Sequence, residues 1–190
     1  MAIVLIQILM TRLYNLANRP FAQPYLTGFG YGASHISFFY SGFIVVSAVL
    51  AKTSHRVSAA LGSRERLDMT LVLALAAASI AAMAFARIGG LGVAALAGVF
   101  AANGLSGPML AASLNRRIGS KRRATVLSMA SMGEHFLGML LGPLYGYLSD
   151  ALSLAASLRL FFWSFGPLLA LCAVFALAVL RPADGDGGRA

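Results

Sequence analysis

Apolar residues are gathered in six long stretches that are separated by short polar connections. The stretches cover residues 2–26, 33–51, 69–86, 91–114, 124–149 and 158–180. Each is close to the ~20 residues that an α-helix needs to cross about 30 Å of hydrocarbon. The pattern predicts an all-α membrane protein whose six transmembrane helices form one domain, residues 1–181, followed by a short disordered cytoplasmic tail, residues 182–190.

The basic residues fall between alternate apolar stretches. One connection, 52–66, carries Lys52, Arg56, Arg64 and Arg66, and another, 115–123, carries Arg116, Arg117, Lys121, Arg122 and Arg123. The intervening connections hold only Arg87 and Arg159. Because Lys and Arg mark cytoplasmic loops, this asymmetry predicts a multi-pass protein of the cell inner membrane with both termini in the cytoplasm.

The composition changes how the net charge of +9 is interpreted. Hydrophobic residues make up 59% of the chain and charged residues 11%, well below the ~25% charged residues of a soluble domain. In a soluble protein such a charge would suggest nucleic acid, but here the basic residues stand at predicted membrane edges. We therefore expect the lipid bilayer as partner, and no nucleic acid.

Nothing in the sequence indicates a metal site, a cofactor or an enzyme. Cys172 is the only cysteine, so an intrachain disulfide and a cysteine metal cluster are excluded. The three histidines, His35, His55 and His135, lack metal-ligand spacing, and no serine stands near a plausible base.

The first apolar stretch is the most polar of the six. In a regular helix Arg12, Asn15, Arg19 and Gln23 lie on roughly one side. Charged residues in a membrane usually face a bundle interior or a water-filled cavity, so this stripe predicts one wall of a polar pathway. The alternative is a marginal or interfacial helix in which Arg19 only reaches back to the membrane surface.

The fourth stretch contains Asn103, Gly104, Ser106, Gly107 and Pro108 close together. Such a cluster favours a kink or local unwinding, which transporters use at binding sites, and this makes Asn103 and Ser106 candidates for the pathway. The alternative is that the glycines allow close helix packing.

The fifth stretch carries a deep acidic residue, Glu134. Gly138, Gly142 and Gly146 follow at intervals of four, so the carboxyl shares a small-residue stripe that predicts close helix packing. A low dielectric favours the neutral form of a carboxyl, and Glu134 is therefore the candidate for reversible proton binding. A structural hydrogen bond to a neighbouring helix is the alternative.

Several segments resemble the major facilitator superfamily. The segments 123–128, RATVLS, and 142–150, GPLYGYLSD, are similar to that family's tenth loop and eleventh helix. The segment 23–26, QPYL, and a second stretch that ends near 61–64, LGSR, look like its seventh and eighth helices. The resemblance covers nearly the whole chain.

The resemblance implies the C-terminal six-helix half of a secondary transporter, built from two inverted three-helix repeats. It also implies proton-coupled transport of a small organic solute by alternating access, with the first and fourth stretches lining the cavity. A six-helix unit would need a second half or a homodimer partner. The alternatives are a non-transporting structural or regulatory membrane subunit and a truncated gene product.

Overall fold

The computed structural model describes residues 2–117 and 120–179, and this part of the chain is helical throughout, without strands. The elements are α1 (Ala2–Leu16), the π-helical turn η1 (Ala17–Phe21), α2 (Ala22–Gly28), α3 (Ala33–Ala60), α4 (Glu65–Phe85), α5 (Gly89–Arg117), α6 (Ser120–Ala151) and α7 (Leu154–Val179). The predicted all-α class is confirmed. The predicted tail, 182–190, lies outside the described residues.

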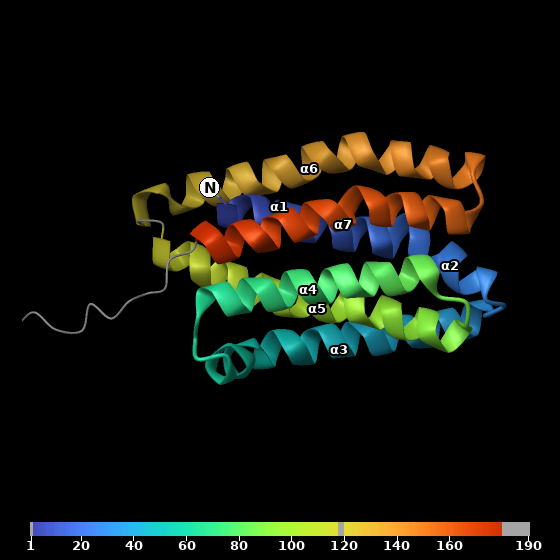
Figure 1. The fold of residues 1–190 in the computed structure, drawn as a ribbon, viewed down its shortest axis with the longest axis horizontal. Coiled ribbons are helices and arrows are strands. Elements are labelled where there is room, and N and C mark those ends of the chain that lie inside the picture. The colour runs from blue at the N-terminus through green and yellow to red at the C-terminus, as the bar shows by residue number, and fades with distance from the viewer. Residues whose placement is uncertain (1, 118–119, 180–190) are drawn as a thin grey trace, which may run out of the picture.

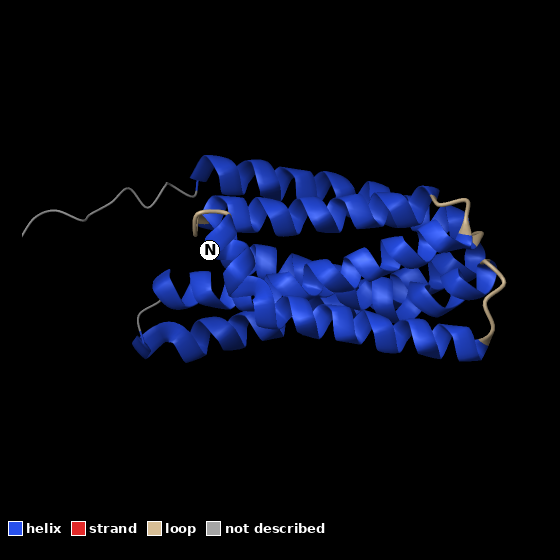
Figure 2. Cartoon of the chain, turned by 90° about the horizontal axis from the view of Figure 1, so that it is seen from below, coloured by secondary structure: helices blue, strands red, loops and turns tan. Residues whose placement is uncertain are grey.

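The helices run roughly along one axis in an elongated bundle (Figure 1). In the middle, α4 packs against α5 and α7, while α3 packs chiefly on α5 at one edge and α6 packs chiefly on α1 at the other. The described connections lie at the two ends of the bundle (Figure 2).

Within the described residues, four helices are long and apolar enough to cross a membrane: α3, α4, α5 and α6. In the most apolar window of α3 and of α6 only 6% of the residues are buried, and exposed side chains such as Val45 and Met132 are apolar. Apolar surface of this extent suits lipid and not water, and it supports a membrane protein.

The other two predicted spans differ from expectation. The first is divided after Leu16, and the sixth, 158–180, lies within α7 up to Val179, a helix of 26 residues that is not among the four. Six membrane crossings and the inverted three-helix repeats therefore stay a prediction.

Two predicted basic loops prove to be partly helical. The α3 helix continues past its apolar part to Ala60, so Lys52 and Arg56 stand on a helix. It ends because Gly62 adopts a φ of 72°, and the amide of Ser63 donates to the carbonyl of Ser58 at 2.7 Å. The hydropathy marked the edge of the apolar segment and not the end of the helix. Likewise, α5 continues to Arg117 and α6 begins at Ser120.

The α3–α4 connection, the end of α5 and the beginning of α6 lie at one end of the bundle (Figure 1), and the sequence is rich in basic residues in these segments. The beginning of α1 and the end of α7 lie at the same end. Next to the α3–α4 connection, Ser58 Oγ donates a hydrogen bond of 2.6 Å to the buried carboxylate of Asp68 in the first turn of α4. This end is the one that the charge pattern assigns to the cytoplasm.

The first predicted helix changes its register in η1. Pro20 lies within this turn, and a proline lacks the backbone N–H that an α-helix needs and clashes with the carbonyl four residues earlier. The chain accommodates it with π-helical geometry, and the hydroxyl of Tyr40 donates to the carbonyl of Asn18 at 2.9 Å. The turn is thereby tied to α3.

The same turn also packs against α6 and α7 through the side chain of Phe21. Phe21 is fully buried, with its ring centroid 6.0 Å from that of Tyr145 in α6 and 5.2 Å from that of Phe161 in α7. Aromatic pairs at these separations contribute about 0.5–1.5 kcal/mol each beyond the burial of their area.

The polar cluster of the fourth stretch lies within the continuous α5 helix, which includes Pro108. Close packing explains Gly104, since a Cβ there would overlap the carbonyl oxygen of Ser47 in α3 and lie 2.9 Å from its Cα. A Cβ at Gly107 would meet nothing within 4 Å.

We predict that Gly104→Ala destabilises the protein by about 1–3 kcal/mol, because the added methyl group meets the backbone of α3 and forces α3 and α5 apart. Gly107→Ala is the matched control, in which the higher helix propensity of Ala leaves stability unchanged or raises it by up to about 1 kcal/mol. Thermal unfolding of the purified protein in detergent measures both. Equal unfolding temperatures for the two variants would contradict this packing.

Candidate functional site

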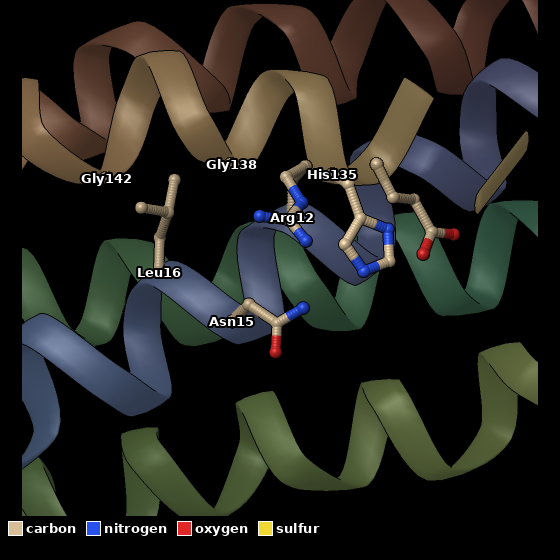
Figure 3. Close-up of a pocket in the computed structure, with 7 residues that line it drawn as sticks. Arg12, Asn15, Leu16, His135, Gly138 and Gly142 are labelled. Carbon is tan, nitrogen blue, oxygen red and sulfur yellow. The ribbon is translucent and has the colours of Figure 1, made fainter. Parts of the chain in front are cut away.

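A cavity of about 650 Å³ lies between α1 and α6 (Figure 3). Its lining residues all come from these two helices: Arg12, Asn15 and Leu16 from α1, and Glu134, His135, Gly138 and Gly142 from α6. The volume is within the range of about 300–1,000 Å³ that is usual for small-molecule sites.

Arg12 reaches from α1 towards α6 at Gly138 (Figure 3). A Cβ at position 138 would overlap Nη1 of Arg12 and lie 2.8 Å from its Cζ, so the guanidinium group occupies the space that a side chain would need. The Nε atom of Arg12 is buried and has no hydrogen-bond partner. The absence of a side chain at Gly138 thus admits a cation between two apolar helices.

A carboxyl group lines the same cavity. Glu134 is half-buried on α6, four residues before Gly138. Among the described residues no ion pair joins it to Arg12. Unpaired charges of opposite sign therefore share one cavity, an expensive arrangement inside a membrane that usually marks a functional site.

His135 projects from α6 towards α1 in the cavity (Figure 3). Its Nδ1 lies 2.7 Å from the carbonyl oxygen of Ser131. Since a carbonyl only accepts, we assign the ring proton of the neutral imidazole to Nδ1, which leaves Nε2 as an acceptor.

The predicted stripe of the first span is only partly kept. Arg12 and Asn15 line the cavity together, whereas Gln23 lies exposed on α2, beyond the register change in η1. The helix is not regular between Asn15 and Gln23, because the π-helical turn η1 stands between them. That all four residues share one side stays a prediction. The side chain of Arg19 lies outside the described part of the structure.

Two further predicted pathway residues lie elsewhere. Asn103 and Ser106 are on α5 and do not line the cavity. Ser106 is buried, and its hydroxyl donates to the carbonyl of Asn103 at 2.9 Å, within the same helix. Their role in a pathway stays a prediction.

The glycine stripe of α6 divides into different environments. Gly138 contacts Arg12, and Gly142 lines the cavity, but a Cβ at Gly142 or Gly146 would meet nothing within 4 Å. No neighbouring atom of the described chain therefore requires a glycine at these two positions. Helix packing at Gly142 and Gly146 stays a prediction, and the packed helix would have to come from a partner chain.

Sequence reasoning missed two lining residues, Leu16 and His135. Leu16 follows Arg12 at a spacing of four, and this spacing could have identified it. His135 lies about 100° around the helix from Glu134, yet both residues line the cavity. That the cavity reaches both positions follows only from the packing of α1 on α6.

No protein-family model matches the sequence, and no curated protein matches it either. The resemblance to the major facilitator superfamily therefore depends on the segments quoted above.

We predict that Gly138→Ala displaces the guanidinium group of Arg12 while costing little stability, because the far end of an arginine side chain moves readily. Phenylglyoxal modification of Arg12, measured by peptide mass spectrometry, should become faster in this variant. Gly142→Ala is the matched control and should react as the wild type does, since its added methyl group meets no atom. Equal rates in the two variants would show that Gly138 does not hold Arg12.

Proposed function

We propose that this chain is a six-helix unit of a secondary transporter that carries a small organic solute across the cell inner membrane by alternating access. The observation that supports this most is the unpaired Arg12 and Glu134 in one cavity between apolar helices. A charge inside a membrane is costly, and it is tolerated where it faces a cavity or meets an ion or solute.

The walls of the cavity support a two-unit arrangement. All residues that line it come from α1 and α6, and α6 lies at the edge of the bundle with its apolar face largely exposed. Alternating access works by movement of one unit against another around a central site. We propose that a second six-helix half or a second copy of this chain provides the facing wall.

The resemblance to the C-terminal half of major facilitator transporters agrees with this proposal. The concentration of basic residues at one end of the bundle supports a topology in which both termini are cytoplasmic.

Glu134 is the proposed site of proton coupling. Its carboxyl lines the cavity, so a proton can reach it from the side of the membrane to which the cavity opens. A carboxyl that binds a proton on one side and releases it on the other would link solute movement to the proton gradient.

A structural or regulatory membrane subunit that transports nothing is the second candidate. The exposed apolar faces of α3 and α6 favour it, because such surfaces also suit contact with other membrane helices. In this alternative, a partner helix covers Arg12 and excludes water from the cavity.

We predict that Glu134→Gln removes proton movement coupled to solute, because an amide cannot take up and release a proton. The assembled transporter is reconstituted in liposomes that contain a pH-sensitive dye and is challenged with a panel of amino acids, organic acids and sugars. Solute exchange without a gradient should persist in the variant at saturating solute concentration.

Asp150→Asn, at the exposed end of the same helix, is the control and should behave as the wild type does. Unchanged proton movement in Glu134→Gln would remove the coupling role. The absence of any solute movement in the wild type would favour the structural subunit.

A further inference from the structure

The two charged groups of the cavity come from facing helices, at positions about one helical turn apart along α6. Arg12 lies over Gly138, and Glu134 precedes Gly138 by four residues, which is about one helical turn or 6 Å along α6. No ion pair of the described residues joins the two groups. Each can therefore take a counter-charge from a ligand.

We propose that the cavity binds a zwitterion of the α-amino acid type, with its carboxylate at Arg12 and its ammonium group at Glu134. This inference rests on the proposed function, since the zwitterion would be the transported solute. An α-amino acid carries both charges on one carbon atom, and it can make a charge-assisted hydrogen bond of about 2.8 Å at each end.

The charge balance favours a zwitterion over an anion or a cation. While Glu134 is ionised, an anion at Arg12 would leave this carboxylate uncompensated beside a second negative charge. A cation at Glu134 would leave Arg12 uncompensated beside a second positive charge. In a medium of low dielectric an unpaired charge costs several kcal/mol, so a ligand that pairs both groups is selected. A zwitterion adds no net charge to the cavity.

The remaining polar groups of the cavity suit the same ligand. Nε2 of His135, as an acceptor, offers the ammonium group a second partner, and the Asn15 amide can donate to the carboxylate. Among the described residues, these two, Arg12 and Glu134 are the polar side chains that line the cavity.

The apolar part of the cavity indicates the rest of the ligand. Leu16 and Gly142 line it on the other side of Gly138 from Glu134, and a Cβ at Gly142 meets nothing within 4 Å. The open space beside Leu16 suits an apolar side chain. The ligand class is therefore an apolar α-amino acid.

The test compares matched ligands on the purified full-length chain in lipid nanodiscs. Alanine, valine, leucine and phenylalanine are each titrated beside the carboxylic acid that lacks the amine and the amine that lacks the carboxylate. At least one amino acid should bind about tenfold or more tightly than both of its partners, because each partner leaves one charge unpaired.

Variants assign the two ends of the ligand. Glu134→Gln should reduce the affinity for that amino acid to the level of its matched acid, and Arg12→Gln should reduce it to that of its matched amine. Asp150→Asn should leave it unchanged. The wild-type comparison needs no variant and decides the question even where a substituted chain fails to fold.

Two results would overturn the proposal: none of the four amino acids binds, or the matched acid binds as tightly as the amino acid does. The second result would indicate a plain anion site. Binding of the amino acid without its transport would instead overturn the proposed function alone, and transport of an acid without amino-acid preference would overturn only this inference.

Discussion

The site depends on one constraint, which is the placement of a guanidinium group inside an apolar helical bundle. A buried cation is costly in hydrocarbon unless it reaches water or a counter-charge. The chain accommodates Arg12 with a glycine on the facing helix, because the space of a side chain at Gly138 is taken by the end of Arg12. This contact places the cation in the cavity that Glu134 also lines.

The π-helical turn limits how far this polar surface extends. It lies between the cavity residues of α1 and the exposed Gln23 of α2, so these polar residues are not carried by one regular α-helix. The turn is held by Phe21, which is buried against rings of α6 and α7, and by the hydrogen bond from Tyr40 to Asn18. The turn that contains Pro20 therefore connects the first helix to α3, α6 and α7.

Much of the fold could be predicted from the sequence, since apolar length determines which segments can span a membrane. Arg12 and Glu134 could be singled out as candidates from the sequence, because charged residues are rare in apolar helices. Gly138 could be singled out by its spacing of four from Glu134. Helix ends could not be predicted in this way, since hydropathy does not show that Lys52 lies within a helix that ends only at Ala60. The inclusion of His135 in the cavity depends on tertiary packing, and the π-helical turn before Gln23 depends on backbone register. A regular helical projection represents neither.

The central claim is that water and polar solutes enter the cavity between α1 and α6. Its most direct measurement is the labelling of Asn15→Cys by a charged, membrane-impermeant thiol reagent in native membranes, in a chain whose own cysteine is removed by Cys172→Ala. Leu13→Cys, on the same helix but buried, is the control and should stay unlabelled. We predict rapid labelling of Asn15→Cys from one side of the membrane. Equally slow labelling of both positions would contradict a water-filled site and favour a helix covered by a partner.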